Sequence, residues 1–325
     1  MMIIRFAIVV ALLGTAPLVA APPASETGEV KFTTEDAKAG VPELFRLESC
    51  TFRYTLTPKY DLVNSGVEIL SLTFPSSVKS AHASNDIVYA TYFRPKSPGK
   101  KPAVIILDIL DGKQVVAEAQ ALWLAQHDVA ALVVVMTYYG PRRPAGSKER
   151  MLTTDVEKSV ANVRQTVLDC RRATAWLASR PDVESGKLSI LGTSLGSFVS
   201  GVVAGAEPRI RSACLLLGGG GLVDSFSEHP LAGGVLSALA LVGVTKQQLK
   251  KLIDPIDPIT YAERLKNKRL LLIAASKDDV VPPIAMKRLW EATGKPELIW
   301  VEATHVGAAG FTFQMMRAVT KHVKE

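Results

Sequence analysis

Apolar strand-like runs that alternate with longer helix-like segments constrain this chain more than any other feature of its sequence. These runs occupy residues 103–110, 129–139, 187–192, 209–219, 268–276 and 297–303. Strands that are apolar on both faces must be covered on both faces, as in a parallel sheet flanked by helices. We therefore expect right-handed β-α-β units that build an α/β fold, with a mainly parallel twisted sheet and helices on both faces.

The segments between these runs predict the helices and the edge of the sheet. Helices are expected at about 114–126, from Thr154 to near Ser179, at 195–206, after Pro282 and Pro283, and from about 310 onward. Thr154 and Glu157 predict a capping box at the start of the second helix. Residues 50–56, 67–74 and 86–93 alternate in part between apolar and polar, which favours antiparallel strands at one edge, with one face exposed to water.

The first residues predict export from the cell. Arg5, an apolar stretch at 6–14 and the small residues that follow are typical of a secretory signal peptide, which we place at 1–21. We expect a periplasmic or extracellular protein with no stable membrane span after signal removal, since the apolar stretch is shorter than the roughly 20 residues that a spanning helix needs. An uncleaved N-terminal anchor is the alternative. Residues 22–66 are interpreted as an N-terminal extension that begins with a flexible lead-in at 22–40, and 67–325 as the main domain.

Charge and cysteine content exclude several other classes of protein. The formal net charge of +7 is spread over scattered basic residues, so we expect no nucleic-acid partner. The three cysteines, Cys50, Cys170 and Cys214, are not spaced like metal ligands, and we expect no metal and no cofactor. An odd number leaves at least one thiol unpaired, while a Cys50–Cys170 disulfide stays open. Nothing in the sequence indicates an oligomeric state.

A serine between two glycines marks the first candidate for chemistry. Ser194 lies in Gly192-Thr193-Ser194-Leu195-Gly196, between a predicted strand and a predicted helix. This context is typical of a nucleophile elbow, in which a sharp turn exposes the hydroxyl and the glycines let the strand and the helix pack closely. The alternative is that the glycines simply loosen a turn.

A serine nucleophile needs a base, and the base needs a carboxylate to orient it. In an open α/β sheet the site lies at the carboxyl ends of the strands, so residues that directly follow a buried strand are the candidates. His305 is the one histidine in this position. Asp278 and Asp279 follow another buried strand, and Asp224 is a third candidate for the acid. The remaining histidines lie in loops, at the opposite end of the sheet or in the tail: His82, His127, His229 and His322.

From about residue 67 the chain resembles an α/β-hydrolase, with a shape like the dienelactone-hydrolase and acetyl-xylan-esterase branch. The resemblance is carried by "YATYFRPKSPGKKPAVIILDI", "LGTSLGS", "DPITYAERL", "ASKDDVVPP" and "EATHVG". It implies the chain order Ser194, Asp278, His305, with Asp278 as the acid because it precedes "-x-V-V-P", and Asp279 as a loop or helix-capping carboxylate. It also implies hydrolysis of carboxylic esters, without a cofactor.

The same resemblance implies two backbone donors for the negative oxygen of a tetrahedral intermediate. One is Leu195, directly after the nucleophile. The other is Ile109, with Leu110 as the alternative, in the loop after the first buried strand. Asp108 departs from the glycine-rich loop of many relatives. Its carboxylate is expected either to oppose the developing charge, to steer a cationic substrate group or, with slight preference, to hold the loop.

Two further segments are expected near the site. The insertion at 222–255 is interpreted either as a lid that lines an apolar pocket or as a helix packed on the body. Arg142 and Arg143 are expected to face solvent, or else to clamp an anionic substrate group.

Together these features predict an exported serine hydrolase that acts on a small-molecule or saccharide ester. A peptidase, an amidase or an acyltransferase would use the same three residues, and fold and triad do not separate these activities. A hydrolase-fold binding protein without catalysis is the remaining alternative.

Overall fold

A computed structural model describes residues 25–62, 64–227 and 245–325 of the chain. Within these residues, ten strands form one sheet in the order β1-β2-β3-β4-β6-β5-β7-β8-β9-β10. The strands are β1 (Glu26–Phe32), β2 (Cys50–Asp61), β3 (Val67–Pro75), β4 (Ile87–Pro95), β5 (Lys101–Leu107), β6 (Ala130–Val134), β7 (Val183–Thr193), β8 (Ile210–Leu216), β9 (Arg269–Ala275) and β10 (Glu297–Val301).

The helices follow the strands in alternation from β5 onward. The α-helices are α1 (Val115–Gln126), α2 (Val156–Ser179), α3 (Leu195–Ala206), α4 (Leu222–Phe226), α6 (Lys246–Ile253), α7 (Ala262–Leu265), α8 (Pro283–Ala292) and α9 (Thr312–Lys324). Short 3-10 turns are η1 (Glu43–Phe45), η2 (Ala83–Asp86), η3 (Gly140–Arg142), η4 (Asp254–Ile256), η5 (Pro258–Tyr261) and η6 (Gly307–Phe311). None of the helices in the described ranges is long and apolar enough to cross a bilayer.

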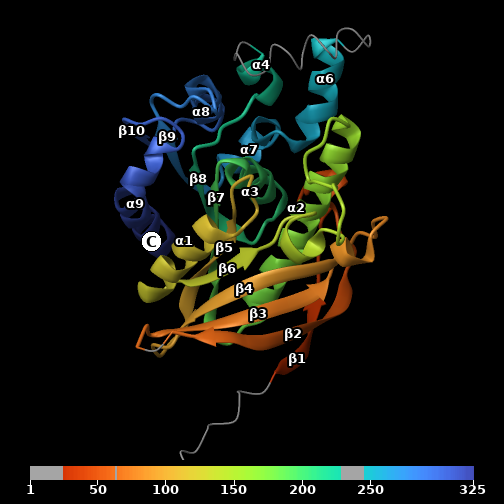
Figure 1. Cartoon of the computed structure of the whole chain (residues 1–325), viewed down its shortest axis with the longest axis vertical. Helices are drawn as coiled ribbons and strands as arrows, with labels where there is room; N and C mark the ends of the chain where they lie inside the picture. Colours follow the sequence, from red (N-terminus) through yellow and green to blue (C-terminus); the bar gives the residue numbers. More distant parts are fainter. Residues whose placement is uncertain (1–24, 63, 228–244) are drawn as a thin grey trace, which may run out of the picture.

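The sheet has an antiparallel part and a parallel part. Strands β1 to β4 pair antiparallel, as does β4 with β6, whereas β6, β5, β7, β8, β9 and β10 pair parallel. In Figure 1, β1 to β4 lie in the lower part of the view, while α4, α6 and α8 lie in the upper part. The predicted α/β class, with a mainly parallel centre and antiparallel N-terminal edge strands, is confirmed.

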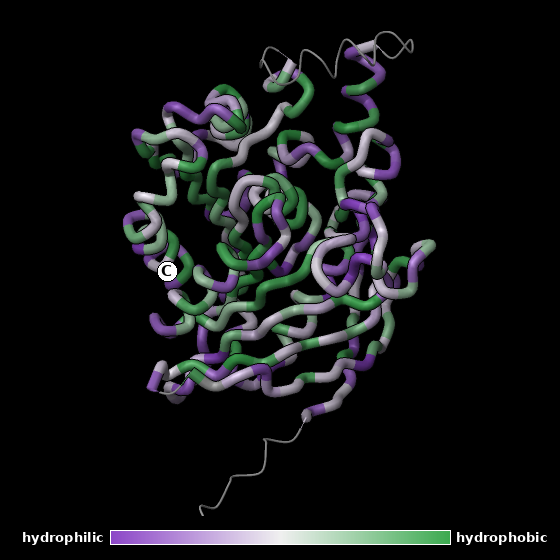
Figure 2. Tube along the Cα trace, viewed as in Figure 1, coloured by the Kyte–Doolittle hydropathy of each residue, from purple (hydrophilic) through white to green (hydrophobic). Residues whose placement is uncertain are grey.

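Helices cover both faces of the parallel strands, as the apolar runs predicted. Along β5, Ala103, Ile105 and Leu107 pack into the core under α2 and α3, and Val104 and Ile106 pack into the core under α1 and α9. This division follows from the alternation of side chains along a strand. In Figure 2 the trace through the central strands is mostly green, hydrophobic, and purple segments lie mainly around it.

The start of the chain corrects one expectation. The predicted signal peptide at 1–21 lies outside the described residues, but the flexible lead-in at 22–40 is wrong from residue 26 onward. β1 pairs with β2 along its length, and its Val30 and Phe32 side chains are buried. Residues 26–61 therefore supply two strands of the same sheet as the main domain.

An ion pair fixes this N-terminal part to α2. Both terminal nitrogens of Arg171 donate to the Asp36 carboxylate, at 2.6 and 2.7 Å, and its Nε donates to Glu207 at 3.0 Å. Asp36, Arg171 and Glu207 are all buried. Bidentate geometry makes this contact both strong and specific in direction.

Two smaller expectations are corrected as well, and one open alternative is decided. The cap of α2 is Asp155, whose side chain accepts from the Lys158 N–H, and not the predicted pair Thr154 and Glu157. The alternative that the sequence left open was a Cys50–Cys170 disulfide, and all three cysteines are free thiols in the structure. Asp155 and not Thr154 caps α2, because Asp155 directly precedes the first helical residue. Its carboxylate therefore reaches the N–H of Lys158, the third residue of the helix.

Arg142 is the second correction, because it neither faces solvent nor can reach a ligand. It is fully buried and donates to Asp169 at 2.7 Å, to the Asn85 carbonyl at 2.7 Å and to the Val135 carbonyl at 3.1 Å. Arg143 is partly buried, and its Nε donates to the Tyr138 carbonyl at 3.0 Å. The buried ion pair between Arg142 and Asp169 holds the loop after β6 against α2.

Candidate functional site

Ser194 lies at the turn between β7 and α3 with an unusual backbone conformation. Its φ is 54° and its ψ is −119°, which is uncommon for any residue other than glycine. Such strain persists only where the surrounding structure enforces it, and it is concentrated at functional sites. The Ser194 N–H donates to the Leu216 carbonyl at 2.9 Å, and the residue is partly exposed.

Close approach of backbones explains the two glycines around Ser194. A Cβ at Gly192 would overlap the Gly196 carbonyl, and a Cβ at Gly196 would overlap the Leu107 carbonyl at the end of β5. Both positions thus require glycine because of the space available to them. The turn that presents Ser194 depends on this fit between β5, β7 and α3.

His305 lies within hydrogen-bond distance of both Ser194 and Asp278. Its Nε2 is 3.0 Å from Ser194 Oγ, and its Nδ1 is 2.8 and 3.0 Å from the two carboxylate oxygens of Asp278. The His305 side chain follows β10 and is largely buried, while Asp278 follows β9 and is buried. A neutral imidazole with Nδ1–H toward Asp278 leaves an Nε2 lone pair for the serine hydroxyl. The structure thus brings the three predicted side chains together in a row.

Two neighbouring carboxylates hold this arrangement from different sides. Asp278 Oδ1 accepts the N–H groups of Val280 at 3.0 Å and Val281 at 2.7 Å, which fixes the carboxylate that faces His305. Asp279 Oδ1 accepts the backbone N–H of His305 at 3.2 Å. The third candidate for the acid, Asp224, pairs with two lysines of α6 instead.

The predicted oxyanion donors belong to two separate segments, the start of α3 and the loop after β5. Leu195 is the first residue of α3, and the first N–H groups of a helix have no acceptor within the helix. Ile109 lies in the loop after β5, and its N–H interacts with the carboxylate of Asp108. Leu110, the alternative donor, is exposed at the tip of the same loop, where the Gly112 N–H donates to the Ile109 carbonyl at 3.3 Å.

Asp108 binds backbone groups of its own loop and of α1. Its buried carboxylate accepts the N–H of Gln114 at 2.6 Å and the N–H of Ala117 at 3.1 Å. Burial raises the pKa of Asp108, and hydrogen bonds from the three backbone N–H groups act against that rise. Of the three expected roles, these contacts are those of a residue that holds the loop.

A buried hydrogen bond that the sequence did not indicate ties α1 to the nucleophile turn. Gln120 Nε2 donates to Thr193 Oγ1 at 3.0 Å, directly before Ser194. Both residues are buried. Because Asp108 accepts N–H groups at the start of the same helix, α1 supports both the loop after β5 and the turn at Ser194. A glutamine inside a helix carries no sequence signal for this role.

Acidic, histidine and cysteine side chains do not gather into a metal site. Within the described residues, no group of three or more of these side chains could hold a metal ion.

Comparisons with known proteins agree with this architecture. The structure resembles an acetyl xylan esterase from Paenibacillus sp., with a TM-score of 0.68, 20% identity and coverage of 82% of this chain and 88% of that one. It also resembles acetyl xylan esterase 1 from Thermoanaerobacterium sp., with a TM-score of 0.64, 19% identity and coverage of 82% and 87%. The chain has the α/β-hydrolase fold. At sequence identities of 20% and 19%, the structural similarity establishes the fold but does not indicate a substrate.

Sequence comparisons match parts of the chain. The family model described as "alpha/beta hydrolase domain containing 18" matches residues 87–231, a span that contains Ser194 but ends before Asp278 and His305. A Mycobacterium tuberculosis protein described as uncharacterized is 26% identical over 194 residues, which cover 56% of this chain and 44% of that relative. The chain thus spans less than half the length of this curated relative.

Proposed function

We propose that this chain is an exported hydrolase that cleaves carboxylic esters through Ser194, His305 and Asp278. The observation that carries the proposal is the hydrogen-bonded row in which Nε2 of His305 lies 3.0 Å from Ser194 Oγ and Nδ1 lies 2.8 Å from Asp278. The strained conformation of Ser194 and the α/β-hydrolase fold support it. Export rests on the signal-like residues 1–21.

The first half of the reaction forms an acyl-enzyme. Ser194 Oγ attacks the ester carbonyl carbon while His305 Nε2 takes the hydroxyl proton. Asp278 holds the imidazole and stabilises its charged form. The C–O bond to the alcohol then breaks, and His305 gives its proton to the leaving oxygen. The backbone N–H of Leu195 stabilises the negative carbonyl oxygen, together with that of Ile109, released from the Asp108 carboxylate, or with that of Leu110.

The second half releases the acid and restores the enzyme. His305 takes a proton from a water molecule, whose oxygen attacks the acyl carbon. The bond to Ser194 Oγ breaks, and His305 returns the proton to that oxygen. The net reaction is ester plus water to carboxylic acid plus alcohol, so these steps require no metal or organic cofactor. A small-molecule or saccharide ester would fit this chemistry equally well.

Covalent labelling by a fluorophosphonate tests the proposal directly. We expect the purified protein to be labelled and the Ser194→Ala variant to remain unlabelled. Hydrolysis of p-nitrophenyl acetate should be lost in the same variant. Equal labelling of both proteins would overturn the assignment of Ser194, and a labelled protein that cleaves peptides or transfers acyl groups in preference to hydrolysing esters would overturn the activity.

A further inference from the structure

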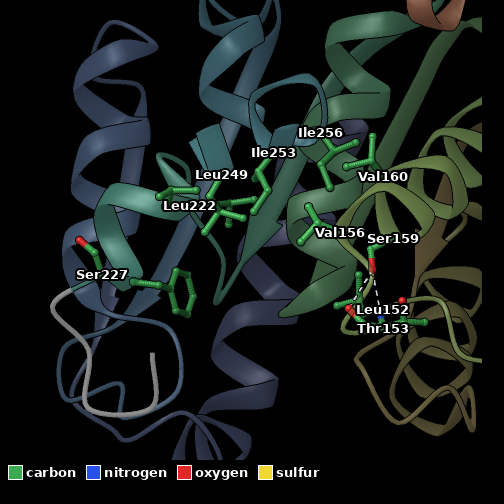
Figure 3. A pocket seen from close by; sticks show the side chains of 12 residues that line it. Leu152, Thr153, Val156, Ser159, Val160, Leu222, Ser227, Leu249, Ile253 and Ile256 are labelled. Carbon is green, nitrogen blue, oxygen red and sulfur yellow. Dashed lines mark hydrogen bonds between the residues drawn. The ribbon is translucent and has the colours of Figure 1, made fainter. Parts of the chain in front are cut away.

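An apolar cavity of about 340 Å³ lies between α2, α4 and α6. Its walls include Val156, Val160, Leu222, Leu249, Ile253 and Ile256 (Figure 3). None of the twelve described residues that line it carries a charge. Its volume falls at the lower end of the roughly 300–1,000 Å³ that ligand pockets span.

The hydroxyl groups around this cavity are already bonded to their own loops. Ser159 Oγ donates to the Thr153 carbonyl at 3.1 Å and accepts the Thr153 N–H at 2.9 Å. Thr153 Oγ1 donates to the Asp155 carbonyl and accepts the Asp155 N–H. Ser227 Oγ donates to the Asp224 carbonyl and accepts from Lys246. A ligand in the cavity would therefore meet a surface that favours hydrocarbon over polar groups.

Sheet topology places this cavity over the same edge as Ser194. One wall, from Leu152 to Val160, comes from the connection that leaves β6, and the other, from Leu222 to Ser227, comes from the connection that leaves β8. Between β6 and β8 in the sheet lie β5 and β7, whose carboxyl ends lead into the oxyanion loop and Ser194. The cavity walls thus rise on both sides of the pair of strands that carry the proposed chemistry.

Helix α4 is a shared wall between the cavity and the candidate triad. Leu222 and Phe226, which line the cavity, also pack against Phe198 and Val281. The Phe198 N–H donates to the Ser194 carbonyl at 3.3 Å, and the Val281 N–H donates to Asp278. Through Leu222 and Phe226, the cavity wall therefore packs directly against residues that are hydrogen-bonded to Ser194 and Asp278.

We propose that this cavity takes the aliphatic acyl chain of the ester, so that the substrate is an ester of a medium-chain or long-chain fatty acid. This inference rests on the proposed ester hydrolysis. The ester carbonyl lies at Ser194, and the hydrocarbon chain extends between the α2 and α4 walls toward Ile253. Each methylene buried there favours the longer chain by a factor of about four.

Acyl-chain preference tests the inference. We expect kcat/KM to rise at least about tenfold from p-nitrophenyl acetate to p-nitrophenyl octanoate, a gain well below full burial of every added methylene. Ile253→Trp fills the cavity and should lower octanoate hydrolysis about tenfold while acetate hydrolysis stays within about twofold. Leu252→Trp is the matched control, because Leu252 is the exposed neighbour on α6 and does not line the cavity. It should change neither rate.

A second variant and a binding experiment separate the possible failures. Val160→Trp fills the cavity from α2, and should repeat the effect if Ile253→Trp does not fold. Ser194→Ala should bind dodecanoic acid labelled with a nitrobenzoxadiazole fluorophore, and adding Ile253→Trp should weaken binding about tenfold. Fatty-acid binding without acetate hydrolysis would overturn the proposed function alone. Three outcomes would overturn the acyl-chain cavity alone. The enzyme could hydrolyse acetate without preferring octanoate, or it could prefer a benzoyl ester. Leu252→Trp could also lower octanoate hydrolysis as much as Ile253→Trp does.

Discussion

The backbone N–H of His305 donates a hydrogen bond to the side chain of Asp279 at 3.2 Å. The imidazole of the same residue is bound by the preceding carboxylate, Asp278. Adjacent acidic residues therefore do different work: one positions the ring, and the other positions the loop that carries it.

Asparagine substitutions at these two positions should differ strongly in effect. Asp278→Asn should lower kcat about 10³-fold to 10⁴-fold, because an amide cannot hold the productive imidazole tautomer or stabilise its charged form. Asp279→Asn should lower kcat less than about tenfold, because its amide oxygen still accepts the His305 N–H. Hydrolysis of p-nitrophenyl acetate measures both. Equal losses would contradict the division of roles.

Alanine at Gly196 should disrupt the fold, whereas alanine at Gly186 should not. The Cβ at Gly196 meets backbone carbonyls of Leu107 and Asp108, which cannot move aside as a flexible side chain can, so we expect a loss of about 3 kcal/mol or more. Gly186 lies in β7 with open space around it and should change the free energy of unfolding by less than about 0.5 kcal/mol. Urea unfolding followed by circular dichroism provides the comparison. Similar stabilities of the two variants would exclude the close approach described for Gly196.

Replacing Asp108 distinguishes a loop-holding carboxylate from one that opposes the oxyanion. Asp108→Ala removes acceptors at the start of α1 and should cost about 1 kcal/mol of stability. The loosened oxyanion loop should lower kcat about 10²-fold. Asp111→Ala is the control, because Asp111 is exposed in the same loop and accepts only the local Lys113 N–H. A rise in kcat for Asp108→Ala would show instead that the charge hinders the reaction.

Removal of the Asp36 charge should make the free energy of unfolding depend less on pH in the acidic range. Burial opposes its ionisation, but hydrogen bonds from Arg171, Thr34 and the Leu47 N–H lower the pKa of Asp36 to about 2. Because the folded-state pKa lies below the unfolded value, this contribution is fully present above about pH 4 and is lost as pH falls toward 2.

Asp36→Asn should therefore cost about 3 kcal/mol at pH 7, where Arg171 would keep Glu207 as its carboxylate partner and the Phe45 carbonyl as a neutral acceptor. The difference from the wild type should shrink as pH falls from 4 to 2. Chemical unfolding at a series of pH values measures it, with Glu35→Gln as the control, since Glu35 is exposed and pairs with an exposed lysine. A constant difference across this range would rule out the titration of Asp36 as its source.

The parallel half of the sheet could be predicted from the sequence, because strands covered on both faces leave continuous apolar runs. In β5 every residue from Ala103 to Leu107 is buried, so the strand appears in the sequence as an uninterrupted apolar run. β1 leaves a weaker pattern, since only Val30 and Phe32 of its seven residues are buried. An edge strand with one solvent-exposed face has the same composition as a polar linker, so composition alone does not distinguish the two.

The positions of the site residues followed from a rule about strand ends, but their supports did not. Ser194 and Asp278 follow β7 and β9, whose carboxyl-terminal halves are buried as the sequence predicted. His305 follows β10, which was expected to be buried but is an edge strand in which only Val301 is buried. Arg142 carries a charge in a loop, and only its distant partners, Asp169 and Asn85, make burial favourable. Such pairs depend on tertiary contacts between separate segments, and no local pattern encodes them.

The two strands that precede residue 67 set a lower bound for any shortened version of this protein. A chain that began at residue 67 would expose the long hydrogen-bonding edge of β3, including buried Leu70 and Leu72, to other molecules. It would also leave Arg171 without its bidentate partner. Trimming to the conventional core would therefore yield a protein that self-associates through β3, and recombinant production should start upstream of Glu26.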